Sequence, residues 1–361
     1  MKICILTDAW SPQVNGVVRT LKTLRRKLRQ QGHSVLVIHP GQFETIPCPG
    51  YKEIRLSLNA PFRLAAMLDC IQADAFHIAT EGPIGWLARR YFMRRNIPYT
   101  TAYHTDFPQY LAARLPIKVD WIYSLLKGFH NAGHGCLVAT DSIAHMLQDK
   151  GFQNIIHWGR GVDTKQFSPV ENIEITSDLP TSEDPIHLYV GRVAVEKNLS
   201  AFLDLTLSGP KVVVGDGPAL SAMKRAYPDV YFMGTKFGDD LRAIYAAADV
   251  FVFPSKTDTF GLVMIEALAC GTPVAAFPVQ GPLDIIGRDG TGTRPLQNGQ
   301  KPPVIGALND DLKQAIDQAL KAKPEDCITY AQYYDWDQVT EEFLTALVPV
   351  ALSDTQMMPA E

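Results

Sequence analysis

Apolar and polar positions follow one another along the chain in blocks that predict strands and helices in turn. K-I-C-I-L-T near the N-terminus is a short apolar run and predicts a strand that ends at Asp8. Apolar residues at 21, 24 and 28 recur at helical spacing in a basic stretch that stops at Gly32, which predicts an amphipathic helix. Further strands are predicted at S-V-L-V-I-H-P, A-F-H-I-A-T and I-P-Y-T-T-A-Y-H, with a helix over 83–95. This order indicates βαβ units and a parallel sheet.

A second series of short apolar runs begins after residue 185. It comprises I-H-L-Y-V-G-R, K-V-V-V-G-D, V-Y-F-M-G, V-F-V-F-P-S and P-V-A-A-F-P. Residues 170–185 between the two series are polar, acidic and contain proline, which is typical of a hinge. The predicted fold class is therefore α/β, with two Rossmann-like, doubly wound parallel-sheet domains, 1–168 and 169–336, that face a central cleft. Ligands are expected at the carboxyl ends of the strands.

Charge is distributed unevenly between the two halves of the chain. The 361 residues carry a net charge of −4, with 46% hydrophobic and 20% charged residues, as in ordinary globular proteins. Residues 1–165 hold 20 Lys and Arg against 11 Asp and Glu, a charge of +9, and the remainder holds 14 against 27, a charge of −13. This asymmetry predicts different partners for the two halves.

The six cysteines are scattered and form no C-x-x-C pair, so they predict neither a disulfide framework nor a zinc site. Cys4 and Cys270 lie in apolar runs and are expected in the core of a cytosolic protein. The first apolar run is too short for a signal peptide, and none reaches the roughly 18 residues of a spanning helix. We therefore expect a soluble protein or one bound to a membrane surface.

Glycines and cations lie where strands are expected to end. Gly16, in T-D-A-W-S-P-Q-V-N-G-V-V-R-T-L, would let an anion approach a helix N-terminus, or else form a plain turn. No G-x-G-x-x-G dinucleotide fingerprint and no P-loop is present. In L-Y-V-G-R-V-A-V-E-K-N-L, Arg192 and Lys197 flank a strand–helix junction and suit a diphosphate. The alternative there is a surface pair between Glu196 and Lys197.

Two acids in K-T-D-T-F-G-L-V-M-I-E-A-L-A-C-G-T-P-V are the most informative residues. Asp258 is predicted in the loop after a buried strand, and Glu266 on an apolar helix closed by Gly271. A carboxylate in apolar surroundings is costly unless it is hydrogen-bonded, and the vicinal hydroxyls of a ribose are suitable donors. The backbone amides of Phe260, Gly261 and Leu262 are expected to meet an anion. The alternative is that Asp258 is only an N-cap and Glu266 only a satisfied core acid.

These motifs together resemble the retaining glycosyltransferases of family 4, which have the GT-B fold. The resemblance extends over nearly the whole chain and rests on segments in family order: V-G-R…E-K-N, D-x-F-G-x-x-x-x-E, H-I-A-T-E-G-P-I-G, Y-H-T-D-F-P-Q-Y, G-R-G-V-D-T-K-Q-F and Q-G-P-L-D-I-I. The most similar subgroup contains GDP-mannose-dependent α-mannosyltransferases and sulfoquinovosyl- or glucuronosyl-diacylglycerol synthases. Many members have Glu where this chain has Asp258, a shorter arm that bears on which sugar hydroxyl is held. The resemblance also implies a closing helix, 337–355, that crosses back to the first domain.

The resemblance assigns a role to each matching position. Glu266 would hold the ribose hydroxyls, and Asp258 with its neighbouring amides the sugar hydroxyls. Arg192, Lys197 and the Gly16 backbone would neutralise the departing diphosphate. His104 would lie near the anomeric centre, although a structural hydrogen-bonding role is the alternative for it. The remaining predicted donor contacts are Gly191, Gly234, Thr259, Phe260, Gly261 and Leu262, with the base near Gly234 to Phe237. Weaker acceptor contacts are Tyr103, Asp106 and Asn15.

The chemistry expected from this resemblance requires no metal and no cofactor. Fixed cations and helix amides stabilise the diphosphate as it gains negative charge. Asp239 and Asp240 open a predicted helix and are expected as N-cap residues and not as a metal clamp. Same-face attack, with a phosphate oxygen taking the acceptor proton, is the retaining mechanism that the resemblance implies.

The acceptor is predicted from the basic surface of the first domain. L-R-R-K-L-R-Q-Q and A-R-R-Y-F-M-R-R-N are basic, and the segment from Pro108 mixes Lys118 and Lys127 with Trp121, Tyr123 and Phe129. Cations beside aromatics suit a lipid interface, although a solvated charged face over core aromatics gives the same pattern. We therefore expect a peripheral enzyme on the inner face of the cell membrane that glycosylates diacylglycerol or a glycolipid, and no nucleic-acid partner.

Several alternatives remain open from the sequence. No short motif separates GDP-mannose from UDP-glucose or UDP-glucuronate. The acceptor is alternatively a soluble sugar or polysaccharide precursor, and a GT-B nucleotide-sugar epimerase would need no acceptor. A phosphorylase would need a pyridoxal lysine motif, for which the sequence has no candidate.

Overall fold

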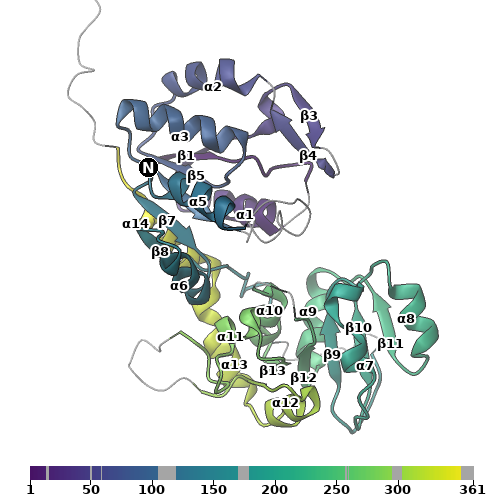
Figure 1. Ribbon diagram of the computed structural model, residues 1–361. Helices are drawn as coiled ribbons and strands as arrows, with labels where there is room; N and C mark the ends of the chain where they lie inside the picture. The colour runs from purple at the N-terminus through teal and green to yellow at the C-terminus, as the bar shows by residue number, and fades with distance from the viewer. Residues whose placement is uncertain are drawn as a thin grey trace, which may run out of the picture. The chain divides into compact units, whose positions relative to one another are not determined.

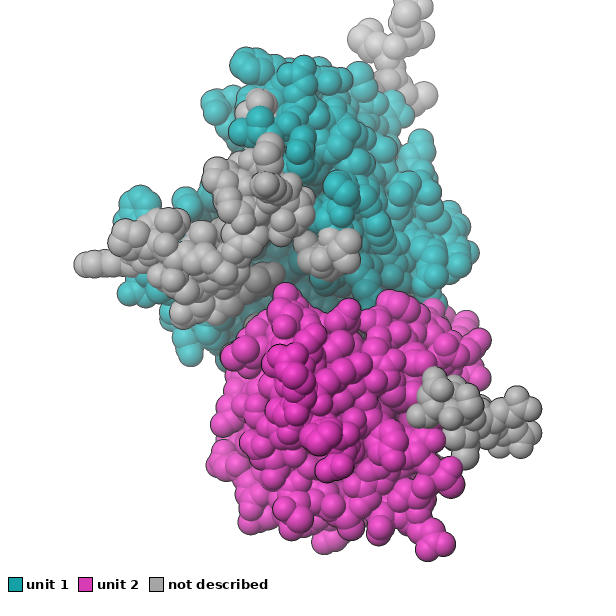
Figure 2. Space-filling model, turned by 90° about the vertical axis from the view of Figure 1, so that its right-hand side faces the viewer, with its two compact units in different colours: residues 1–160, 339–361 teal, residues 161–338 magenta. Residues whose placement is uncertain are grey.

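The computed structural model divides the chain into two compact units (Figures 1 and 2). Unit 1 comprises Met1–Arg160 with Val339–Glu361, and unit 2 comprises Gly161–Gln338. The sequence prediction placed these divisions after residues 168 and 336. The residues that the structure describes are 1–13, 16–48, 51–57, 59–104, 119–169, 179–256, 258, 260–294 and 303–350. Most of the predicted hinge, 170–185, therefore lies outside the described residues.

Unit 1 contains a six-stranded parallel sheet in the order β2-β1-β5-β6-β7-β8. The strands are β1 Lys2–Leu6, β2 Ser34–Ile38, β5 Ala75–Ile78, β6 Thr100–Tyr103, β7 Gly135–Val138 and β8 Ile155–His157. The helices are α1 Gly16–Gln30, α2 Ala60–Asp69, α3 Pro83–Arg95, α5 Val119–His130, α6 Asp141–Asp149 and the short η1 Pro40–Gln42. Strands β3 Thr45–Cys48 and β4 Tyr51–Ser57 form a separate antiparallel pair. In the chain they lie between η1 and α2.

Unit 2 repeats this plan with the order β11-β10-β9-β12-β13-β14, again all parallel. The strands are β9 His187–Val190, β10 Lys211–Val214, β11 Tyr231–Gly234, β12 Val250–Phe253, β13 Val274–Ala276 and β14 Gly306–Leu308. The helical segments are η2 Val195–Lys197, α7 Ser200–Leu203, α8 Leu220–Ala226, α9 Gly238–Ala247, α10 Leu262–Ala269, α11 Gln280–Ile285, α12 Leu312–Ala319, α13 Pro324–Ala331 and η3 Gln332–Tyr334. Helix α14, Trp336–Ala346, begins in unit 2 and ends in unit 1, because the division falls between Gln338 and Val339.

The predicted α/β fold class is confirmed in each unit, since each is a doubly wound parallel sheet. All residues of β5, β6, β7, β9 and β12 are buried, which is the pattern of strands covered on both faces. The sequence analysis missed β3, β4, β7, β8 and β14. Several of these strands are very short, such as G-A-L in β14.

Helix α1 shows how the sequence pattern becomes packing. Its apolar residues Leu21, Leu24 and Leu28 are fully buried, as their spacing predicts. The intervening positions carry Lys22, Arg25 and other cations on the outer side of the same helix. Burial of each leucine stabilises the fold by roughly 1.5–3 kcal/mol, so this stripe fixes α1 against the sheet.

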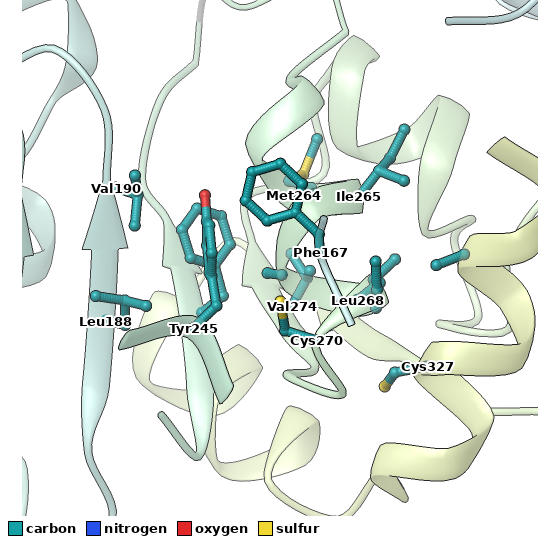
Figure 3. Packing of buried hydrophobic residues seen from close by; sticks show 14 of the residues in the cluster. Phe167, Leu188, Val190, Tyr245, Met264, Ile265, Leu268, Cys270, Val274 and Cys327 are labelled. Carbon is teal, nitrogen blue, oxygen red and sulfur yellow. The ribbon is translucent and has the colours of Figure 1, made fainter. Parts of the chain in front are cut away.

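The core of unit 2 surrounds α10, whose residues Met264 to Ala269 are all buried. Figure 3 shows this core, with Leu188 and Val190 of β9 and Tyr245 of α9 beside Met264 and other residues of α10. Cys270 is the C-cap of α10, one residue before the predicted cap Gly271, which follows in a left-handed conformation (φ 92°). The strand–loop–helix order around Asp258 is otherwise as predicted.

The end of β1 is held on the first turn of α3 by a partly buried carboxylate. Asp8 accepts hydrogen bonds from the backbone nitrogens of Ile84 (2.9 Å) and Gly85 (3.3 Å) and from the Thr80 hydroxyl (3.2 Å). A carboxylate is favourable at a helix N-terminus. Burial nevertheless raises the pKa of Asp8 to about 6, against the lowering effect of these hydrogen bonds.

Within the described residues, no helix combines the length and the apolar character that crossing a bilayer would require.

Asp8 should make the stability of the fold depend on pH in a specific direction. Because its pKa is about 6 in the folded state against a reference value of 3.8, the native protein binds this proton more tightly than the unfolded chain. The free energy of unfolding should therefore fall as pH rises from about 4 to about 6, by about 3 kcal/mol for this group. Urea unfolding of the wild type and Asp8→Asn across this range measures the effect, because the asparagine does not titrate.

The control for this measurement is Asp149→Asn, an exposed acid of α6. We expect the stability difference between the wild type and Asp8→Asn to decrease as pH rises, whereas the difference for Asp149→Asn stays nearly constant. A difference for Asp8→Asn that does not vary with pH would contradict the prediction.

Candidate functional site

Two predicted site residues from distant parts of unit 2 form a close ion pair. The Lys197 Nζ lies 2.5 Å from Asp258 Oδ1, and both side chains are 24% exposed. Lys197 ends the short helix after β9, and Asp258 lies in the loop after β12. The other oxygen, Asp258 Oδ2, is buried and has no hydrogen-bond partner among the described residues. The lysine thus orients the carboxylate and leaves one oxygen available to accept from a ligand hydroxyl.

The N-cap of α10 lies three residues beyond this loop acid. It is Gly261, at φ 85°, and no side chain of the described residues caps the helix. The interpretation of Asp258 as the N-cap is therefore wrong, because the carboxylate is bound to Lys197. Amides in the first turn of a helix attract anions and hydroxyl oxygens. A side chain at Gly261 would be strained in this conformation, and its Cβ would lie 2.7 Å from Met264 Cε.

The structure describes some of the other donor-site residues that were predicted in and after this loop. Phe260 is partly exposed and its ring packs against Tyr334 at 6.3 Å between centroids. Leu262 is the first residue of α10. Gly281 packs against the loop backbone, since a Cβ there would lie 2.8 Å from the Asp258 carbonyl oxygen. Thr259 lies outside the described residues.

Glu266 has the hydrogen-bond partner that its apolar helix cannot supply. The Tyr245 hydroxyl donates to Glu266 Oε2 at 3.1 Å, and both side chains are buried. The tyrosine ring is itself fixed by edge contacts with Phe167 and Phe251. Binding of ribose hydroxyls by Glu266 stays a prediction.

Arg192 does not join Lys197 in the structure. Its side chain is 64% exposed, and Nη1 lies 3.8 Å from Glu196 Oε1, one helical turn away. The alternative of a Glu196–Lys197 surface pair is therefore wrong, because Glu196 pairs with Arg192 and Lys197 with Asp258. An exposed pair of this kind is worth only about 0–1 kcal/mol, so a ligand phosphate competes for Arg192 readily.

Backbone around Arg192 is held by a buried tyrosine. The Tyr189 hydroxyl donates to the Arg192 carbonyl oxygen at 2.9 Å. A Cβ at Gly191 would lie 2.9 Å from the same hydroxyl, so glycine permits this turn to lie against the tyrosine. Gly234 ends β11, and Phe237 is an exposed residue before α9. These segments follow β9 and β11 at the same edge of the sheet, where the base was predicted.

Asp239 and Asp240 are not N-cap residues. The N-cap of α9 is Phe237, and the two acids lie inside the first turn. There they complement the positive end of the helix dipole, which explains their position. Among the described residues, no group of His, Cys, Asp and Glu side chains is arranged to hold a metal ion.

In unit 1, His104 and Gly16 also follow strand ends. His104 comes directly after β6, and Gly16 opens α1 with open space around its Cα. Tyr103 is buried, with its ring against His130 and Phe152, so its acceptor contact stays a prediction. Asp106 and Asn15 lie outside the described residues.

The aromatic segment predicted at the acceptor surface divides into two kinds of residue. Tyr123 and Phe129 are buried in the core, as the alternative interpretation holds. Trp121 is 74% exposed on the same helix, α5. Lys127 is partly exposed, and Lys118 lies outside the described residues.

His104 is held by a residue to which the sequence gave no role. Arg160 Nη1 lies 2.9 Å from His104 Nδ1, and Arg160 Nη2 donates to the His104 carbonyl oxygen at 3.4 Å. The His104 ring contacts Trp158 edge-on, at 5.8 Å between centroids. Burial, with help from the Arg160 charge, holds the pKa of His104 well below its usual value. Neither Arg160 nor Tyr245 carries a local signal, since each lies far in sequence from the residue it contacts.

The chain is similar to known proteins over most of its length. Residues 14–166 match the description Glycosyltransferase Family 4, and residues 184–321 match Glycosyl transferases group 1. A GDP-mannose-dependent alpha-mannosyltransferase of Corynebacterium glutamicum is 30% identical over 314 residues, which cover 79% of this chain and 74% of the relative. An alpha-monoglucosyldiacylglycerol synthase of Streptococcus pneumoniae is 28% identical over 370 residues, 90% of this chain and 79% of the relative.

Solved structures confirm the fold. A sucrose-phosphate synthase from Thermosynechococcus elongatus superposes with a TM-score of 0.70 at 20% identity, covering 95% of this chain and 97% of the other. Both units of the chain thus have counterparts in a structure of the GT-B class. With the strand-end residues described above, these matches show that the chain is an enzyme that belongs to glycosyltransferase family 4.

Proposed function

We propose that this glycosyltransferase moves a hexosyl group from a nucleotide-diphosphate sugar to a lipid acceptor at a membrane surface. The donor is GDP-mannose or a UDP-hexose or UDP-hexuronate, and the acceptor is diacylglycerol or a glycolipid. Transfer retains the anomeric configuration and needs no metal ion. The observation that carries the donor assignment is the Lys197–Asp258 pair beside the uncapped N-terminus of α10.

The proposed role of the cations follows from the charge that develops during the reaction. Breaking the sugar–phosphate bond leaves an oxocarbenium-like centre and a diphosphate that gains negative charge. Lys197 has three donor positions, of which one is directed at Asp258, and Arg192 is exposed and weakly paired. With the amides of α10, they supply the fixed positive charge that a departing diphosphate needs without a metal.

The proposed role of the acids follows from their different surroundings. Asp258 presents a buried oxygen without a partner among the described residues, which suits a single sugar hydroxyl. Glu266 is oriented by Tyr245 inside the helix, which suits the paired hydroxyls of a ribose. Along the chain, Asp258 would thus contact the sugar, the amides of α10 the phosphate, and Glu266 the ribose. His104, after β6, keeps its predicted contact with the sugar.

The lipid acceptor is supported by relatives and by the surface of unit 1. The relative from Streptococcus pneumoniae is named for the synthesis of a glucosyldiacylglycerol. Lys22, Arg25, Arg26 and Arg29 of α1 line an open hollow of about 400 Å³ together with Gln30. Each basic residue beside an anionic membrane contributes about 1 kcal/mol. This charge would hold the enzyme on the inner face of the cell membrane.

Exposed apolar side chains on unit 1 support the same proposal. Trp121 and Leu125 lie one turn apart on α5 and are 74% and 51% exposed. Residues at this spacing share one face of a helix, and an aromatic with an aliphatic neighbour is typical of interfacial insertion. At the end of α3, by contrast, Arg95 is already paired with Asp69 at 3.2 Å. The cations of α1 that line the hollow are the ones that we propose for lipid contact.

The donor-site assignment predicts a coupled loss of activity. Asp258→Asn should lower kcat roughly 100-fold or more, because a hydroxyl contact made by the oriented carboxylate is lost. Lys197→Met should have a similar effect, since it removes both a phosphate contact and the partner of Asp258. The double variant should be less impaired than the product of the single effects, because the two side chains act as one unit.

Nucleoside diphosphate release measures these effects, with Asp317→Asn, an exposed acid of α12, as the matched control. The control should retain activity. Strictly multiplicative losses in the double variant would show that the pair does not function together.

The donor and acceptor can be identified in one experiment. The purified enzyme is given GDP-mannose, UDP-glucose, UDP-galactose or UDP-glucuronate, each with and without anionic vesicles that contain diacylglycerol. We expect diphosphate release from one donor to rise with the vesicles and to persist in EDTA. Release that ignores the vesicles would direct the search to soluble sugar acceptors or to an epimerase reaction, and loss in EDTA would contradict the metal-free proposal.

The basic face of α1 should set the affinity for anionic membranes. Replacing Arg25 and Arg26 with glutamine should weaken binding by about 2 kcal/mol, or roughly 30-fold, at low salt. Co-sedimentation with anionic and neutral vesicles measures this, and added salt should reduce the difference. The charge-matched control replaces Lys224 and Arg225 of α8 in unit 2. Equal binding by the α1 variant and the wild type would contradict the membrane role of this surface.

A further inference from the structure

A partly buried arginine contacts the proposed catalytic histidine through two separate atoms. The two hydrogen bonds of Arg160, to the Nδ1 (2.9 Å) and the carbonyl oxygen (3.4 Å) of His104, come from one guanidinium fork. Arg160 follows β8 and His104 follows β6, and β7 lies between these strands in the sheet. The fork therefore fixes both the ring and the backbone at the carboxyl end of β6.

The chemistry of arginine decides which imidazole nitrogen carries the proton. A guanidinium donates hydrogen bonds and accepts none. Burial lowers the pKa of Arg160 to about 10, so it remains charged at neutral pH. His104 Nδ1 must therefore accept, and the single proton of the neutral ring lies on Nε2.

Other groups around the ring favour the same neutral state. After burial, the charge of Arg160 lowers the pKa of His104 most, and His77 and His130 add to this effect when they are charged. His77 is neutral, since burial lowers its pKa to about 3. Burial alone would lower the pKa of His130, but its interactions with Cys136 and Glu81 raise it to about 9.

The proton on Nε2 has no acceptor in the described part of the chain. His104 Nε2 is buried and lacks a hydrogen-bond partner among those residues. Buried polar groups in folded proteins are almost always satisfied, so an unsatisfied donor directly after a strand end is a candidate for a ligand contact. The Arg160 guanidinium is also without a carboxylate partner among the described residues, which is unusual for a buried cation.

We propose that Arg160 is a positioning residue that holds His104 as the neutral tautomer with its proton on Nε2. His104 then donates a hydrogen bond to an oxygen of the donor sugar or its phosphate, and does not act as a base. The ligand assignment rests on the proposed function, whereas the tautomer is a property of the free enzyme. Arg160 acts only through the ring that it orients.

Nitrogen NMR of the free enzyme tests the tautomer directly. Protein labelled with ¹⁵N in its histidine rings gives long-range ¹H–¹⁵N correlations that distinguish the two tautomers and the charged ring. The signals of His104 are assigned by their loss in His104→Gln. We expect a single neutral form protonated on Nε2 from roughly pH 5 to 8. A ring protonated on Nδ1, or one that titrates in this range, would overturn the proposal.

Replacement of Arg160 tests whether it imposes this state. In Arg160→Met, we expect a mixture of tautomers and a His104 pKa that moves up toward the usual value, because a neighbouring cation is gone. Arg160→Lys keeps one charged donor and should retain the tautomer in part. The control is Arg89→Met, which removes an arginine bonded to the Gly128 carbonyl oxygen in the same unit. A spectrum of Arg160→Met that matches the control would refute the role of Arg160.

Kinetics then separate positioning from folding. Arg160→Met should lower kcat by up to roughly 100-fold with little change in the KM of the donor, and Arg160→Lys should restore part of the loss. A loss confined to KM would overturn the positioning role. If Arg160→Met does not fold, the wild-type spectrum and Arg160→Lys still decide the question. Absence of activity with every donor would refute the proposed function and leave the tautomer result intact.

Discussion

The structure depends on one constraint, that a parallel sheet covered by helices on both faces can expose polar chemistry only at its ends. Strands such as β6, β9 and β12 are buried throughout, and the residues of chemical interest come directly after them. His104 follows β6, Arg192 follows β9 and Asp258 follows β12. Within each unit, the sheet thus acts as a frame that brings loops from distant parts of the sequence to one edge of that sheet.

Much of the fold and the list of site residues could be predicted from sequence, because local patterns encode them. Apolar runs indicated most strands, and helix 83–95 was predicted with the bounds that the structure shows. The pairing of the site residues could not be predicted. Lys197 and Asp258 are 61 residues apart, His104 and Arg160 are 56 apart, and Tyr245 and Glu266 are 21 apart. Strand order in the sheet brings such residues together, and a single sequence does not state that order.

The two arginines at strand ends show why exposure matters as much as residue type. Arg192 is 64% exposed and loosely paired with Glu196, so it can turn to an incoming phosphate at little cost. Arg160 is bound to both the ring and the carbonyl oxygen of His104 and cannot turn without releasing them. The sequence marked Arg192 because it resembled a phosphate ligand. It offered no reason to distinguish Arg160 from the other residues of its motif.

The aspartate at position 258 gains significance from its lysine partner. An aspartate has one methylene fewer than the glutamate found there in many family members, so its carboxylate reaches less far and needs a fixed anchor. Lys197 supplies that anchor through one oxygen, and burial without a partner among the described residues leaves the other as an acceptor in a defined place. A shorter arm held in this way loses less side-chain entropy when a hydroxyl binds. In the donor role that we propose for it, the pair favours a precise contact with one sugar hydroxyl over a flexible contact with several.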